Sequence, residues 1–208
     1  PVTGGNVSFY NESPQGAVYP TPVIGMLGLL EDYTKAVNQW FKQAGHDIAL
    51  LGEPCAGIGA SQYLQTQFQL ISGQVFPVDL QAEKRLNSLL VRLSSASLLA
   101  SAHDVSEGGL LVCLAECCFN HQELLGAEFN FSLTYKPSAE YFGESPGRVV
   151  ISYPPEHETE IAAMASQTGI RFTRLGSVTG KPLFRINKDV WLDVGEMVRV
   201  YGSGLIFD

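Results

Sequence analysis

The sequence lacks a long run of apolar residues and an excess of basic charge. Its longest apolar stretch, residues 22–30, includes two glycines and is far shorter than the roughly 20 residues that a membrane-spanning helix needs. Thirteen Lys and Arg against 21 Asp and Glu give a formal net charge of −8, without a basic stripe interleaved with aromatic residues. We therefore expect no membrane and no nucleic acid as partner. A small anionic ligand is compatible with this charge, because a local site can bind it.

Cysteine is scarce, and its placement does not resemble a secreted disulfide framework. The four cysteines are Cys55, Cys113, Cys117 and Cys118, and three of them fall in one expected helix. This pattern favours a reducing compartment, so we expect a cytoplasmic protein. Cys113, Cys117 and His121 share one helix face, a spacing that could contribute to a zinc site. We favour the other interpretation, in which these cysteines are small buried apolar side chains.

Three common catalytic signatures are also missing. The glycines at residues 52 and 57–59 are not followed by Gly-Lys-Ser/Thr, so they do not form a phosphate loop, and we interpret them as turn glycines. The sequence has no Gly-x-Ser-x-Gly elbow and no Cys-x-x-Cys pair. This excludes the usual serine hydrolase and thiol redox sites.

The remaining composition is that of a globular protein, with 45% hydrophobic and 16% charged residues. We place a domain boundary near residue 36, with residues 1–35 as the end of one domain and residues 36–208 as a second. The chain begins at Pro1, and we expect it to be part of a longer protein. Residues 23–30 are typical of a strand buried on both faces, and we expect its sheet outside this chain. Without that sheet the strand should favour association.

Strand and helix patterns alternate after residue 36. The expected strands are residues 48–51, 98–102, 128–135, 148–153, 172–178, 182–186 and 190–194. The expected helices are residues 62–70, 80–93, 110–119 and 156–168. This mixture predicts an α/β (α+β) fold, built as a two-layer α/β sandwich.

Two segments have the composition of a ligand site. In Gly4-Gly5-Asn6-Val7-Ser8, the glycines allow close backbone approach, the Asn6 amide oxygen can bind a hard cation, and the Ser8 hydroxyl can bind a phosphate or carbonyl oxygen. The alternative is a glycine turn before a strand. The second segment, residues 103–109, places His103, Asp104 and Ser106 before a helix. There Asp104 could hold magnesium, Ser106 could cap the helix, and His103 is better explained as a hydrogen-bonded structural residue than as a base.

Together, four segments in this order resemble the small type of the phosphoribosylformylglycinamidine synthase family. They are Pro1–Ser13 with its Gly-Gly-Asn-Val-Ser, Pro20-Thr21-Pro22-Val23-Ile24-Gly25-Met26-Leu27-Gly28, Ala102–Leu110 with its His-Asp-Val-Ser-Glu-Gly-Gly, and Phe142-Gly143-Glu144-Ser145-Pro146-Gly147-Arg148. The resemblance covers residues 1 to about 150. It implies that residues 1–35 end the second nucleotide-binding, PurM N-terminal-like domain, and that residues 36–208 form the second PurM C-terminal-like sandwich.

The resemblance also implies an ATP-dependent ligase. In this family ATP phosphorylates the amide oxygen of formylglycinamide ribonucleotide, and ammonia from glutamine displaces the phosphate to give the amidine. Carried over by residue, Gly5 contacts ATP through its backbone, Asn6 binds Mg²⁺ and Ser8 contacts the ribonucleotide. The family's catalytic histidines lie in the first half, so we expect no catalytic residue in this chain and no activity from it alone. The expected partners are a glutaminase subunit and a small bridging subunit.

Several alternatives stay open. His103, Asp104, Glu144 and Ser145 match the duplicated copy of the family's motifs, which either lines a pseudo-site for a structural nucleotide or binds nothing. Another PurM-like enzyme, such as aminoimidazole ribonucleotide synthetase, has the same domain plan, although the string from Gly4 to Glu12 argues against it. The chain could also be a non-catalytic structural or nucleotide-binding module.

Overall fold

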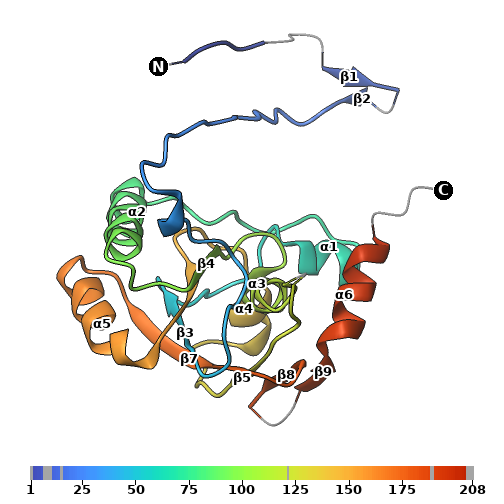
Figure 1. Cartoon of the computed structure of the whole chain (residues 1–208). Coiled ribbons are helices and arrows are strands. Elements are labelled where there is room, and N and C mark those ends of the chain that lie inside the picture. The colour runs from blue at the N-terminus through green and yellow to red at the C-terminus, as the bar shows by residue number, and fades with distance from the viewer. Residues whose placement is uncertain (1, 7–10, 15, 121, 188–189, 205–208) are drawn as a thin grey trace. The chain divides into compact units, whose positions relative to one another are not determined.

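The computed structural model describes residues 2–6, 11–14, 16–120, 122–187 and 190–204 (Figure 1). The chain divides into two units, residues 1–31 and residues 32–208. In the described part of the chain, every helix is too short or too polar to cross a bilayer.

The first unit contains one small antiparallel hairpin. Strand β1 (Glu12–Ser13) pairs with β2 (Gly16–Ala17), and the Val18 amide donates to the Asn11 carbonyl at 3.0 Å. The strand predicted over residues 23–30 is not formed, and its apolar side chains are exposed, including Val23 at 93% and Leu27 at 106%. A strand needs a neighbour to satisfy its backbone groups, and these residues pair with no other strand among the described residues.

The second unit is built around a mixed sheet of seven strands. Strand β3 (Asp47–Leu51) is buried along its whole length, lies inside the sheet, and pairs antiparallel with β6 (Val149–Tyr153) and with β7 (Phe172–Thr179). The other strands are β4 (Ser101–Asp104), β5 (Gly126–Phe129), β8 (Leu183–Ile186) and β9 (Val190–Asp193). The order across the sheet is β4-β6-β3-β7-β5-β8-β9, and β5 with β8 is a parallel pair.

Helices occupy most of the connections between these strands. They are α1 (Gln62–Phe68), α2 (Leu80–Ser95), α3 (Gly109–Cys117), α4 (Pro137–Phe142), α5 (Glu158–Gln167) and α6 (Val194–Ser203), with short 3₁₀ turns at Tyr33–Lys35 and Pro155–His157. Local sequence explains where α2 begins, because the Asp79 carboxylate accepts from the Gln81 and Ala82 amides at 2.9 and 3.0 Å. Proline at the first position of α4 also favours a helix start, because a backbone N–H at that position would have no partner within the helix.

The alternation of side chains along β3 separates two hydrophobic clusters. Ile48 and Leu50 face the cluster that includes residues of α3 and α6, whereas Ala49 and Leu51 face the cluster formed with α2 and α5. Figure 1 shows α2 and α5 together on one side of the sheet and α3 with α6 on the other. Helices therefore cover both faces of the sheet at its centre.

Towards β9, the described residues cover one face of the sheet. Phe129 and Phe184 turn into the cluster beside α3, while the alternate residues Glu128 and Arg185 form an ion pair at 3.2 Å. The Arg185 guanidinium also lies 4.2 Å from the ring centre of Trp191, which is 54% exposed. The α/β class predicted from the sequence is confirmed, with two layers at this end and a further helical layer at the centre.

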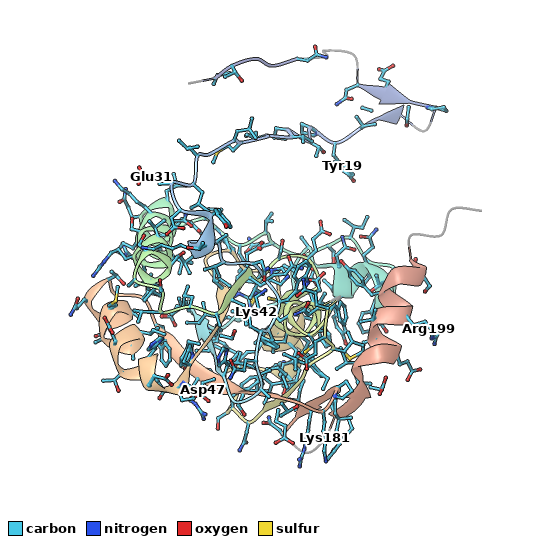
Figure 2. The ribbon with its side chains drawn as sticks, viewed as in Figure 1. Tyr19, Glu31, Lys42, Asp47, Lys181 and Arg199 are labelled. Atoms are coloured by element: carbon cyan, nitrogen blue, oxygen red, sulfur yellow. The ribbon has the colours of Figure 1, made fainter. Side chains whose placement is uncertain are left out.

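A polar cluster joins β3, β7 and α5 at the first residue of β3. The Asp47 carboxylate, 7% exposed and labelled in Figure 2, pairs with the Arg174 guanidinium at 2.5 Å, and Arg174 also reaches Glu158 at 3.3 Å. The Tyr153 hydroxyl donates to Glu158 at 3.2 Å, and burial is the main reason why the pKa of Tyr153 is raised. The buried carboxylate of Asp47 is thus compensated by a cation.

We predict that Leu89→Ala destabilises the chain by about 2–5 kcal/mol, because Leu89 is 0% exposed between α2 and the sheet. Urea unfolding followed by circular dichroism measures this change in the free energy of unfolding. The control is Val91→Ala on the same helix, where the side chain is 66% exposed and the expected change is within about 0.5 kcal/mol. Equal effects of the two substitutions would contradict the packing of α2 described above.

Candidate functional site

The first candidate segment lies in an open stretch of the first unit. Gly5 and Asn6 are exposed, and no atom of the described residues lies within 4 Å of where a Cβ on Gly5 would be. Ser8 lies outside the described residues. The roles expected for Gly5, Asn6 and Ser8 therefore stay predictions.

The second candidate segment meets the 142–148 segment in the second unit. Asp104 at the end of β4 is the register partner of Val149 at the start of β6, and the Val105 amide donates to the Arg148 carbonyl at 2.9 Å. A groove of about 510 Å³ opens where the two segments meet. The structure thus brings together Asp104, Glu144 and Ser145, which the sequence analysis selected from two separate motifs.

The Glu144 carboxylate is the centre of this arrangement. Its Oε1 accepts from the Gly108 amide at the start of α3 and from the Gln62 amide at the start of α1, both at 2.8 Å. A carboxylate is favoured there, because the first amides of a helix are unsatisfied and the helix dipole is positive at that end. The start of α3 is thus occupied by a carboxylate of the chain itself.

Glycines allow the segments to approach each other closely. A Cβ on Gly109 would lie 2.7 Å from the Phe142 backbone, and a Cβ on Gly52 would lie 2.2 Å from the Gly147 carbonyl oxygen. Both glycines also have positive φ, at 75° and 115°, which other residues rarely adopt. The glycines of these motifs are therefore explained by packing and backbone conformation without a ligand.

Ser106 does not cap helix α3. The N-cap residue of α3 is Gly108, with φ of 80°, and this position has no side-chain capping hydrogen bond. The prediction that Ser106 caps the helix is wrong, because the Glu144 carboxylate reaches the Gly108 amide instead.

His103 is held in place by its neighbours. Its Nε2 lies 3.1 Å from Glu116 Oε2, its Nδ1 lies 3.4 Å from Asp104 Oδ1, and 13% of its side chain is exposed. These contacts agree with a structural histidine.

Arg148 carries a buried positive charge beneath the groove. It is 3% exposed, and it donates from Nη2 to the Gly143 carbonyl at 2.5 Å and from Nε to the Ser145 carbonyl at 3.1 Å. Its Nη1 has no partner among the described residues. Burial lowers the pKa of this guanidinium, while the nearby Cys55, Cys113, Glu140 and Glu144 favour its charged form. Arg148 thus fixes the backbone of the loop that carries Glu144.

The groove itself is lined by carboxylates. Glu83, Asp104, Glu107 and Glu144 contribute to its wall, and Arg148 is a cation in the same wall. The charge of the four carboxylates disfavours a bare phosphate. The described residues contain no group of three or more His, Cys, Asp or Glu arranged to hold a metal ion.

The cysteines of α3 belong to the core. Cys113, Cys117 and Cys118 are at most 2% exposed, and burial raises the pKa of Cys117 and raises that of Cys118 to about 12. Zinc binds the thiolate, which is disfavoured here. His121, the third residue of the zinc hypothesis, lies outside the described residues. Buried apolar packing explains the described cysteines.

Comparison with known proteins gives a consistent family. Residues 43–189 match the family model described as "AIR synthase related protein, C-terminal domain". Over 210 residues the chain is 40% identical to phosphoribosylformylglycinamidine synthase subunit PurL of Carboxydothermus hydrogenoformans, which covers 99% of the chain and 29% of that protein. The chain spans about a quarter to three tenths of the length of the curated relatives it matches.

Solved structures show the same fold. PurL of Thermotoga maritima complexed with FGAR superposes with a TM-score of 0.67 at 19% identity, covering 79% of this chain and 30% of that one. The same protein complexed with ATP gives a TM-score of 0.63 at 18% identity, covering 79% and 27%. The predicted PurM-like sandwich is thereby confirmed.

We predict that Glu144→Ala lowers the free energy of unfolding by about 1.5–3 kcal/mol, because two helix amides lose a charged acceptor. Glu144→Gln should cost less, since its carbonyl oxygen can still accept. Thermal unfolding together with hydrogen exchange at the Gly108 amide measures both effects. Glu107→Ala, at an exposed neighbouring position, is the control. Unchanged exchange at Gly108 in Glu144→Ala would refute the role of this carboxylate.

Proposed function

We propose, from the premise that this chain belongs to the family of AIR synthase related proteins, that it is part of an ATP-dependent ligase that forms formylglycinamidine ribonucleotide. The observation that carries the proposal is the 40% identity to a PurL subunit over 99% of the chain. The four ordered motifs named above support it. The proposed reaction consumes formylglycinamide ribonucleotide, ATP and ammonia derived from glutamine in purine biosynthesis.

We place residues 1–35 at the end of a nucleotide-binding domain and residues 36–208 in the sandwich domain. The family model begins at residue 43, which agrees with a sandwich that starts nearby. A Pro-rich and Gly-rich segment such as residues 1–31 buries little by itself, and its exposed apolar residues suit a neighbouring sheet in the complete protein.

Gly5, Asn6 and Ser8 are the residues that we place at the working site. The absence of a side chain at Gly5 leaves its backbone open to the phosphates of ATP, as its empty surroundings among the described residues allow. The exposed Asn6 offers an amide oxygen, a suitable donor for Mg²⁺. Ser8 would hydrogen-bond the ribonucleotide. Magnesium, when bound, offsets phosphate charge.

The groove around Glu144 has no catalytic role in this proposal. The Gly108 amide at the start of α3 already binds the Glu144 carboxylate, and the groove wall carries further carboxylates. We infer that this copy of the duplicated motif serves as a structural junction. The proposed partners are a glutaminase subunit and a small bridging subunit, and the proposed location is the cytoplasm.

The alternatives make different predictions. A PurM-like enzyme such as aminoimidazole ribonucleotide synthetase would cyclise its substrate and need no ammonia. A non-catalytic module would leave turnover of the complete protein unchanged when Asn6 is replaced. Both can therefore be separated from the proposal by one set of variants.

We predict that Asn6→Ala in the complete protein weakens magnesium-dependent ATP binding by about 10- to 100-fold and reduces amidine formation, because one oxygen ligand of the metal is lost. Calorimetry measures binding, and an assay with formylglycinamide ribonucleotide, ATP and ammonia measures turnover. Gln43→Ala removes another exposed amide and should change neither.

The 208-residue chain should show no turnover in the same assay, because we place the catalytic histidines outside it. Unchanged ATP binding and turnover in Asn6→Ala would contradict the proposed metal site and indicate that residues 4–6 form only a turn. Turnover without ammonia would favour a cyclising enzyme.

A further inference from the structure

An apolar groove lies between α3 and α6, apart from the loops around Glu144. It has a volume of about 650 Å³. Phe184 and Ile186 of β8 form part of its lining, together with Leu192 of β9. One wall is the outer side of α3, and the other is α6. A groove between two helices over a sheet has space for a further element packed on both.

The residues along α6 suit helix packing. Met197, Val200 and Tyr201 follow the i, i+3, i+4 spacing of one helix face and line the groove. Val200 and Tyr201 are each 57% exposed, and Leu192 is 46% exposed. Such side chains form ridges into which those of another helix can pack. A contiguous apolar surface of this kind marks a binding site more often than scattered apolar residues do.

The two helices meet at one end of the groove. The Phe119 ring, just after the end of α3, and the Tyr201 ring of α6 lie 5.3 Å apart between centres. This contact fixes α6 against α3, so the walls are held before any partner binds. A preformed groove lowers the entropy cost of association.

The charges of the groove all have one sign. The charged residues that line it within the described part of the chain are Glu116, Asp193 and Glu196. Glu196 has 69% of its side chain exposed, and its contact with Arg199 is long, at 3.9 Å. Arg199 lies on the side of α6 turned away from the sheet (Figure 2). The rim is therefore acidic, and the chain as a whole carries a net charge of −8.

We propose that this groove binds an amphipathic helix of a partner polypeptide, with its apolar face on α3 and α6 and lysine or arginine residues opposite the acidic rim. Apolar burial supplies affinity, and the matching charges orient the helix and speed association. The proposal rests on the groove alone and does not depend on the ligase activity.

The test uses the 208-residue chain and three fluorescein-labelled peptides. The first is a helical peptide with leucines on one face and lysines on the other, the second replaces each lysine with glutamate, and the third carries two prolines in the middle. Fluorescence anisotropy gives each Kd at low and high salt. We expect the lysine peptide to bind at least about tenfold more tightly than the other two, with an affinity that falls as salt rises.

Paired variants locate the binding surface. Val200→Gln with Leu192→Gln should weaken the lysine peptide at least about tenfold, and Val91→Gln on α2 should not, since all three side chains are exposed in the free chain. Glu196→Lys should weaken binding of the lysine peptide and strengthen binding of the glutamate peptide. Glu160→Lys on α5 should change neither affinity. Equal binding of the two charged peptides, or variants without effect, would overturn the proposal.

Two other occupants are excluded by separate measurements. If a chain ending at residue 204 binds the lysine peptide more than about tenfold tighter than the full chain, residues 205–208 cover the groove and the proposal fails. If sedimentation shows a dimer that Val200→Gln with Leu192→Gln dissociates, a second copy is the occupant and the proposal also fails. A monomer whose affinity is independent of residues 205–208 supports it.

Discussion

The buried strand β3 determines how the rest of the second unit is arranged. All five of its residues are buried, and it hydrogen-bonds to a strand on each side. A strand buried on both faces needs apolar cover from two directions, which α2 and α5 supply on one side and α3 with α6 on the other. Asp47, the first residue of β3, is a buried carboxylate, and the Arg174 guanidinium beside it balances its charge. The positions of these four helices therefore follow from covering one strand.

The loops at the other end of β3 are also closely packed. Gly52 follows the strand directly and allows the Gly147 carbonyl to approach. The Arg148 guanidinium donates hydrogen bonds to two neighbouring carbonyls of the same loop. Glu144 then satisfies the amides of two helices. Sequence motifs of the kind usually associated with phosphate binding are here completed by a carboxylate of the chain. A motif match therefore identifies the family, whereas the contacts determine what this copy of the motif does.

Much of the second unit could be predicted from periodicity. The expected strand at 48–51 and helix at 80–93 correspond to β3 and α2, because a continuous apolar run and a leucine spacing are strong signals. The strand expected at 98–102 instead covers Ser101–Asp104, since pairing with β6 outweighs the local apolar pattern. The expected strand at 128–135 ends at Phe129, and α4 was missed because six residues beginning with proline give little helical periodicity.

The candidate site was predicted less completely. The segment around His103 was selected from composition and that around Glu144 from the family resemblance, but the contact of Glu144 with Gln62 spans 82 residues and leaves no local signal. The burial of Arg148 has the same origin, because it depends on neighbours contributed by several segments. Helix α6, with glycines at both ends, was also not anticipated, and the groove beside it depends on that helix. Long-range packing is the part that a single sequence does not reveal.

The position of β3 in the chain also has a consequence for biosynthesis. Both partners of β3 come from far downstream, since Leu51 pairs with Val149 and with Phe172. A ribosome adds about 5–20 residues per second, so β3 leaves the exit tunnel many seconds before either neighbour exists. During that interval its apolar residues have no native strand to pair with. A chain that ends before β7 would therefore lack one of the two strands that β3 pairs with.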